Sequence, residues 1–310
     1  DPYISTALSR YFPKPLRERF APQIAQHPLK REIIATHVVN SMVNRVGPTF
    51  VSRLHGELGA APGDIVRAYM ASREVFRLVP TWRDIESLDN IVADAVQTEM
   101  IVETVRLAQR GAMWFLHRRN WIADLGATLE YFSAGSAALS AGLLDFVGPT
   151  HREVLESAAA GLVEKGVPAP LAARIASLEE TYSALDLVEV AAETGRPEAT
   201  VAEVYYGLAD HLDFYWRGRQ IGALPATTRW QALARSASRS DLSHHARVLA
   251  ANALKLCPDA AGPEDAIAAW RSRNRQDIDR YLHLLADVKT AAAIDMSMLS
   301  VLLRELRNMN

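Results

Sequence analysis

The sequence predicts an all-α protein, a multi-helix bundle with two related helical subdomains, and three observations carry this prediction. Apolar residues recur at three- and four-residue spacing almost throughout the 310 residues, which is the period of an amphipathic helix. The prolines fall between these periodic segments, near positions where a helix can begin. Alternating β-branched runs and Asn-Gly hairpin turns are absent from the sequence, so strands have little support.

The helical segments follow one another along the chain. The first long helix is predicted over residues 29–46, with a buried stripe formed by Ile33, Ile34, His37, Val38, Ser41 and Met42. The next covers 65–78, and Asp64 is placed to cap its free amides. Further helices are predicted over 90–117, 129–144, 152–165, 199–217, 228–237, 241–256 and 264–306, the last being too long for one uninterrupted helix.

A pattern in the first half of the chain recurs 136 residues later. The positions concerned are Val51, Leu54, Glu57, Gly59, Ile65, Tyr69, Ile85 and Leu88, which match Leu187, Val190, Glu193, Gly195, Val201, Tyr205, Ile221 and Leu224. In both copies a helix stops at a glycine, the usual left-handed end, and a second helix carries an inward tyrosine. The prediction is a duplicated helix-turn-helix-like unit, with subdomains over 1–145 and 146–310.

Composition narrows the class of protein. The chain is 49% hydrophobic and 23% charged with a formal net charge of −2, so nothing calls for nucleic acid or an anionic membrane as a partner. No run of about 18 apolar residues predicts a membrane span. The single cysteine, Cys257, is expected to be half-buried at the end of a helix. One cysteine cannot form an internal disulfide, so a reducing, cytoplasmic setting is predicted. The start at Asp1, without an initiator Met or signal peptide, predicts a fragment or processed product.

The usual local cradles for cofactors and metals are missing from the sequence. No two glycines are separated by a single residue, so no G-x-G-x-x-G can bring the backbone against a pyrophosphate. No Walker-type loop, H-E-x-x-H, paired C-x-x-C or G-x-S-x-G is present. We therefore predict no catalytic residue, no bound cofactor and no metal in these 310 residues.

Two groups of histidine and aspartate residues are candidate sites. His244 and His245 are neighbours on a helix and point about 100° apart, so we expect a helix surface there rather than a metal site. Asp210 and Asp213 are expected on one solvated helix face around His211.

Two further polar groups are predicted to have structural roles. The 273–280 stretch, with Asp277 and Asp279, predicts an exposed helix laced with ion pairs. Thr36, Asn40 and Asn44 are spaced by four on the first long helix and, if they are buried, predict a structural polar network between helices, with contact to a ligand as the alternative.

Ordered polar strings then point to a family. The first are YFPKPLRERF (11–20), REIIAT (31–36), VNRVGPTFVSRL (43–54), DIVRAY (64–69), REVF (73–76) and IESLDN (85–90). Later ones are ALDLVE (184–189), RWQALAR (229–235) and MLSVLLRELR (298–307). Together they resemble the C-terminal region of the large bacterial NAD-specific glutamate dehydrogenases, over nearly the whole chain.

The resemblance implies a parent enzyme that oxidises L-glutamate with NAD and water to 2-oxoglutarate, ammonium and NADH. In that family the catalytic and dinucleotide-binding segments precede this region, so no catalytic residue carries over. A non-catalytic role is implied: bracing the catalytic domain of its own chain, assembling a homo-oligomer, or regulation. Candidate contact anchors are Trp121, Tyr131, Phe132, Tyr215 and Trp216, and candidate anion or interface contacts are Arg31, Arg53 and Arg73.

Two other classes of function remain open on the sequence. The units around Gly59 and Gly195 could belong to a DNA-binding regulator, but the second candidate recognition helix carries Glu203, Asp210 and Asp213, which would repel phosphates. A stand-alone helical enzyme would need inward carboxylates or a metal cluster, and no D-D-x-x-D-like run occurs.

Overall fold

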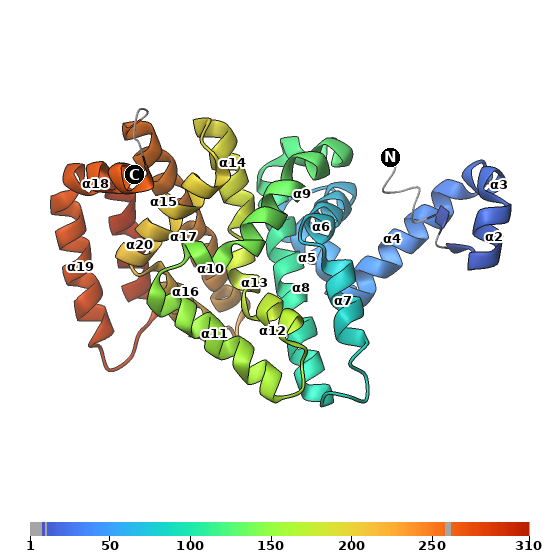
Figure 1. Ribbon diagram of the computed structural model, residues 1–310, viewed down its shortest axis with the longest axis horizontal. Coiled ribbons are helices and arrows are strands. Elements are labelled where there is room, and N and C mark those ends of the chain that lie inside the picture. The colour runs from blue at the N-terminus through green and yellow to red at the C-terminus, as the bar shows by residue number, and fades with distance from the viewer. Residues whose placement is uncertain (1–7, 10, 258–261, 310) are drawn as a thin grey trace. The chain divides into compact units, whose positions relative to one another are not determined.

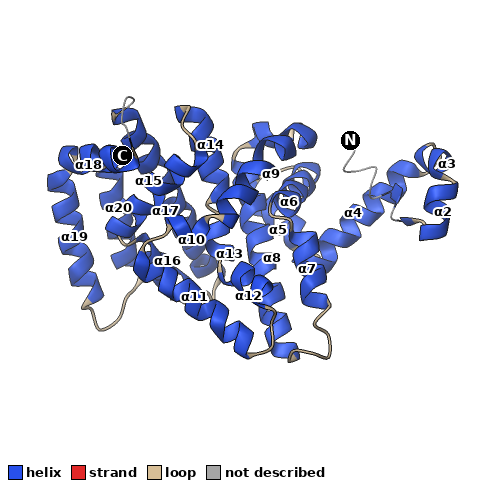
Figure 2. Cartoon of the chain, viewed as in Figure 1, coloured by secondary structure: helices blue, strands red, loops and turns tan. Residues whose placement is uncertain are grey.

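The protein is helical wherever its structure is described. A computed structural model describes residues 8–9, 11–257 and 262–309, and within these ranges it contains helices and no strand (Figure 2). The all-α prediction is confirmed. The chain divides into two compact units, the first formed by residues 1–137 and 156–182 and the second by 138–155 and 183–310. The chain thus crosses between units three times, whereas a single boundary after residue 145 was predicted.

The first unit is built around helix α6. Its elements are α2 (Lys14–Arg19), α3 (Ala21–Ala25), α4 (Lys30–Val46), α5 (Phe50–Leu58), α6 (Pro62–Val75), α7 (Leu78–Glu86), α8 (Asp94–His117), the 3₁₀ turn η1 (Arg119–Ile122), α12 (Ala169–Ala176) and α13 (Leu178–Thr181). Two longer helices, α9 (Leu125–Ala141) and α11 (Pro149–Glu164), contain residues of both units. Figure 1 labels the α-helices along the chain.

The core of the first unit lies where α6 packs on α8. Helix α6 also contacts α4, α5, α7 and η1, and it buries seven of its 14 residues, including Ile65 and Tyr69. Trp82 of α7 is buried and its indole N–H donates to the hydroxyl of Thr104 on α8 at 2.7 Å. Helix α6 is therefore the central packing element of the first unit.

The second unit is organised around the 28-residue helix α17. Its elements are α10 (Leu143–Phe146), α14 (Ala184–Thr194), α15 (Glu198–His211), α16 (Phe214–Ala223), α17 (Arg229–Leu256), α18 (Pro263–Arg273), α19 (Arg275–Lys289) and α20 (Met296–Asn308). Helix α17 contacts α14, α15, α16, α18 and α20. Leu249, Ala250 and Ala253 on α17 are fully buried, as is Trp270 on α18. These small and aliphatic side chains allow several helices to approach α17 closely.

The two units share a run of four helices at a constant offset. Helices α5, α6, α7 and α8 correspond to α14, α15, α16 and α17, and a shift of 136 residues carries both ends of α6 onto those of α15. Within each run the same neighbours pack together, the second helix on the fourth and the third on the fourth. This is the arrangement expected of the predicted divergent repeat, which remains an inference about the origin of the chain.

The turns at corresponding positions have the same backbone conformation. Gly59 and Gly195 end α5 and α14 in the left-handed region, with φ of 62° and 67°. Arg77 and Asp213, also 136 residues apart, begin α7 and α16 at φ of 51° and 52°. A residue other than glycine in the left-handed region is uncommon and costs free energy. Its occurrence at matching positions indicates that the backbone follows the same path in both units.

Several predicted helix boundaries are wrong, for identifiable reasons. Ala61 rather than Asp64 is the N-cap of α6, because Pro62 already supplies the first helical residue, and Asp64 instead pairs with Arg67 in the first turn at 2.6 Å. The predicted helix 199–217 is broken at Asp213. The helices predicted at 228–237 and 241–256 are one, α17, which Thr228 and Gln231 start with a capping box. The 264–306 segment forms three helices.

Candidate functional site

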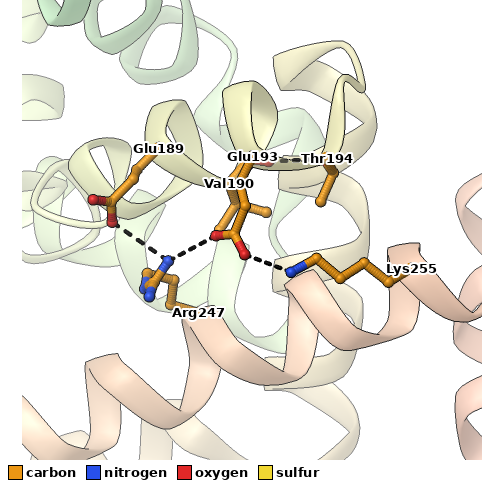
Figure 3. Close-up of polar contacts among 6 residues, drawn as sticks. All are labelled: Glu189, Val190, Glu193, Thr194, Arg247 and Lys255. Atoms are coloured by element: carbon orange, nitrogen blue, oxygen red, sulfur yellow. Dashed lines mark hydrogen bonds and ion pairs between the residues drawn. The ribbon is translucent and has the colours of Figure 1, made fainter.

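Four charged side chains join α14 to α17 at the surface of the second unit (Figure 3). Glu189 and Glu193 are four residues apart on α14, and Arg247 and Lys255 are eight residues apart on α17. The two members of each pair therefore lie on the same side of their helix. Arg247 Nη1 lies 3.4 Å from Glu189 Oε2 and 3.2 Å from Glu193 Oε2. Lys255 Nζ donates to Glu193 Oε1 at 2.5 Å. We call these four residues the α14–α17 clamp.

The clamp favours the ionised form of its central carboxylate. The hydrogen bond from Lys255 is the main cause that lowers the pKa of Glu193, and the charge of Arg247 acts in the same direction. The folded-state pKa lies below the ordinary 4.5, so the stabilisation is present above that pH and is lost as the pH falls through the folded value. Because Glu193 and Lys255 are 40% and 51% exposed, solvent screening limits the contribution to about 0–1 kcal/mol.

The ends of α14 and α17 are tied together beyond the clamp. Arg196 Nη2 donates to the backbone carbonyl of Cys257 at 2.9 Å. Within α14 itself, Thr194 Oγ1 donates to the carbonyl of Val190 at 2.7 Å (Figure 3). Cys257 is half-buried at the C-terminal end of α17, as predicted. In the first unit Arg119, which corresponds to Lys255, donates to the carbonyl of Leu58 at the end of α5 at 3.4 Å. A basic side chain thus reaches the same helix end in both units.

A buried arginine joins α16 to α19 in the second unit. Arg217 is 0% exposed. Its Nη2 donates to the hydroxyl of Tyr281 at 2.5 Å and to the carbonyl of Leu212 at 3.3 Å, and the Tyr281 hydroxyl donates to the same carbonyl at 2.8 Å. Burial lowers the pKa of Arg217 and raises the pKa of Tyr281 to about 12. The Nε and Nη1 atoms of Arg217 have no hydrogen-bond partner among the described residues.

Arg217 is not among the site residues that the sequence predicted. The residue sits in the polar and aromatic string DFYWRGRQ (213–220) beside exposed Arg219, and no local pattern distinguishes the two arginines. Their fates differ because the chain folds Tyr281, 64 residues away, against only one of them.

The predicted polar network on α4 is not buried in this chain. Thr36, Asn40 and Asn44 lie on one side of the helix at four-residue spacing, and all three are exposed. The buried residues of α4 are Val38, Met42 and Val46 instead. Val38 and Met42 belong to the apolar stripe predicted from the sequence, and the polar network of the other stripe stays a prediction.

The three predicted anion-contacting arginines do not form one cluster of unsatisfied charges. Arg53 pairs with Glu57 one turn along α5 at 3.4 Å. Arg73 is half-buried, pairs with Glu74 at 2.5 Å and donates to Ser41 at 3.4 Å. Arg31 is exposed on α4. The role of these arginines in binding an anion or an interface stays a prediction.

The aromatic anchors have different surroundings. Phe132 is 0% exposed and contacts the rings of Trp121 and Tyr131 at centroid distances of 5.0 Å and 4.9 Å. It is therefore a core residue, and its prediction as a contact anchor is wrong. Trp121 and Tyr131 are half-buried. Tyr215 and Trp216 are half-buried too, and the ring of Tyr215 is tilted against that of His151 with a centroid distance of 3.9 Å.

The histidine and aspartate groups form no metal centre in the described ranges, where no three His, Cys, Asp or Glu side chains are placed to hold an ion. His244 is exposed as predicted, but His245 is buried, because it lies on the inner face of α17. Asp210 and Asp213 do not share a helix face, since α15 ends at His211 and Asp213 caps α16. Asp213 also pairs with Lys289.

The charged stretch near residue 277 behaves as predicted. Arg280 pairs with Asp277 at 2.9 Å within α19, and with Glu305 of α20 at 2.8 Å. Ion pairs therefore link these two helices at the surface. Within the described part of the chain, no helix combines the length and the apolar composition that crossing a bilayer requires.

Comparison with known proteins decides the family. Residues 1–308 match the family model described as glutamate dehydrogenase, C-terminal. The chain belongs to the C-terminal family of glutamate dehydrogenases. The resemblance of the sequence to this C-terminal region is thus confirmed.

Three similar relatives are NAD-specific glutamate dehydrogenases. The chain is 33% identical to that of Pseudomonas aeruginosa over 310 residues, covering 100% of the chain, and 33% identical to that of Halomonas elongata over 309 residues, covering 99%. It is 32% identical to that of Mycobacterium tuberculosis over 305 residues, covering 98%. The chain spans only 19% of the length of each of these relatives.

Proposed function

We propose that this chain is the non-catalytic, helical C-terminal portion of an NAD-dependent glutamate dehydrogenase. The whole enzyme would convert L-glutamate, NAD and water to 2-oxoglutarate, ammonium and NADH. In this proposal the helical portion braces the catalytic portion of its own polypeptide and contributes to assembly of a homo-oligomer. Glutamate and NAD bind outside these 310 residues. The single Cys257 fits a reducing, cytoplasmic setting.

The observation that carries the proposal is the match of residues 1–308 to a C-terminal family, while the chain spans only 19% of its relatives. The internal packing agrees with a bracing role. Helices α6 and α17 each lie at the centre of a unit, and ion pairs such as the α14–α17 clamp fasten helices to one another. A part whose helices are held in this way can transmit restraint to a neighbouring part of the polypeptide.

The test compares three proteins: the full-length enzyme, the same enzyme lacking residues 1–310, and the 310-residue chain. We expect glutamate oxidation and tight NAD binding from the full-length enzyme only. The shortened enzyme should lose turnover and show a changed oligomer mass by light scattering. Unchanged folding, oligomer mass and turnover after the deletion would refute the bracing role, and glutamate oxidation by the 310-residue chain would refute its non-catalytic assignment.

A further inference from the structure

Exposed apolar side chains concentrate near the beginning of the described chain. Of the eleven large apolar side chains that are exposed in the described ranges, five lie within residues 11–39, and they are Tyr11, Leu16, Phe20, Leu29 and Val39. We call residues 11–40 the N-terminal arm. Single exposed apolar residues are ordinary on a protein surface, but a concentration in one segment is typical of a contact surface.

The arm has almost no core of its own. Helix α2 has no buried residue, and α3 buries only Ile24. Helices of six and five residues are too short to be stable in water without packing. The arm does fold on itself, since Arg17 Nε donates to the carbonyl of Phe12 at 2.6 Å and the Phe12 ring lies 5.8 Å from His27. These contacts fix its shape while leaving its apolar side chains on the outside.

The arm is also basic. Residues 11–40 carry five basic side chains against two acids, Glu18 and Glu32, and the basic residues are Lys14, Arg17, Arg19, Lys30 and Arg31. A surface that covers the arm should therefore have an apolar centre and acidic residues around it, because that arrangement matches both the apolar side chains and the charge.

We propose that the N-terminal arm docks on an acidic-rimmed apolar surface of the polypeptide that precedes it in the full-length dehydrogenase. This inference rests on the proposed function. The chain spans 19% of its relatives and matches their C-terminal part, so in those relatives most of the polypeptide lies before this region. A covalently connected segment is present at high effective concentration, which favours it over a second copy as the occupant.

Carbodiimide cross-linking of the full-length enzyme, followed by mass spectrometry, tests the docking directly. The reagent joins a lysine to a carboxylate only when the two are in contact. We expect Lys14 or Lys30 to be joined to Asp or Glu residues of the preceding polypeptide. Lys255 with Glu193 and Lys289 with Asp213 are internal positive controls, because both pairs are in contact. Exposed Lys165 serves as the control outside the arm.

The cross-links also identify the occupant. In enzyme assembled from isotopically light and heavy chains, links between the arm and the preceding segment should join light to light and heavy to heavy. Mixed pairs would place another subunit on the arm and overturn the proposal. The proposal also fails if the two control pairs form links while Lys14 and Lys30 form none with preceding residues.

Variants of the full-length enzyme provide a second measurement. Replacing Leu16 and Phe20 together by Asp should raise the hydrogen-exchange rate of residues 11–31 at least tenfold, since the apolar contact is lost. Ile91→Asp, at a site that is 70% exposed outside the arm, should leave that rate unchanged. Equal exchange in the two variants would overturn the docking. The deletion described above tests bracing separately, because the 310 residues could brace the enzyme through other surfaces even if the arm were free.

Discussion

Gly111 of α8 lies where this helix packs tightly against the end of α6. A Cβ added at Gly111 would overlap Ser72 Oγ and would lie 2.8 Å from Phe76 Cε2 and 3.0 Å from Ser72 Cβ. Such distances are too short for carbon contacts, so the neighbours would have to move. Glycine is therefore required here by the packing of two helices rather than by its backbone conformation.

We predict that Gly111→Ala destabilises the protein. Helix propensity alone favours alanine over glycine by about 1 kcal/mol. Overpacking a well-packed core costs about 1–3 kcal/mol. The upper part of this range applies because the added Cβ would clash with both Ser72 and Phe76. The expected net result is a loss of about 1–2 kcal/mol in the free energy of unfolding.

Gly56→Ala on α5 is the matched control. It lies in a helix of the same unit, and nothing is within 4 Å of the added Cβ. Propensity should act there without a clash and raise the free energy of unfolding by about 0.5–1 kcal/mol. The two glycine-to-alanine changes should therefore have opposite signs.

Urea unfolding followed by circular dichroism measures both variants. Because the two units can unfold separately, hydrogen exchange should also show faster exchange in α6 and α8 for Gly111→Ala. Adding Ser72→Ala removes the overlapping hydroxyl and should recover at least about 0.5 kcal/mol of the loss. If Gly111→Ala stabilises the protein as much as Gly56→Ala does, the close contact of α6 with α8 is refuted.

Three further predictions concern the second unit. Tyr281→Phe leaves the buried guanidinium of Arg217 without its hydroxyl acceptor and should cost about 1–3 kcal/mol in urea unfolding; a loss below the error of the method would contradict this role. Gly195→Ala meets no atom within 4 Å but keeps φ near 67°, so backbone strain should cost about 1 kcal/mol, and a gain in stability would show that the turn is not left-handed. Burial, His244, Arg307 and Arg217 together lower the pKa of His245 against the opposing charge of Asp241. The unfolded chain therefore binds a proton on His245 at a higher pH than the folded chain does. The free energy of unfolding should fall as the pH drops below 6.5, by up to about 1.4 kcal/mol per pH unit. In urea titrations from pH 7 to pH 5, His245→Gln should make this pH dependence less steep.

Much of the fold follows from local patterns. Apolar spacing predicted the long helices α4, α8 and α11 to within a few residues, because one buried face of a helix must repeat every three to four residues. Gly59 and Gly195 marked helix ends, since the left-handed conformation favours glycine. The 136-residue offset between them was also visible in the sequence. The shorter helices α2, α3, α7, α12 and α13 were not predicted, because four to nine residues hold too little periodicity.

Other features depend on residues far apart in the sequence, and only the folded chain decides them. Asp213 takes a left-handed conformation although it is not a glycine. The local sequence therefore contains no glycine or proline that predicts the break between α15 and α16. His244 and His245 are neighbours on α17 and were both expected at the helix surface, but packing buried His245 and left His244 exposed. The chain's periodicity and ordered polar strings therefore determined that it is helical and to which family it belongs. Which face of each helix is buried depends on the neighbouring helices, because burial is a property of contacts between distant segments.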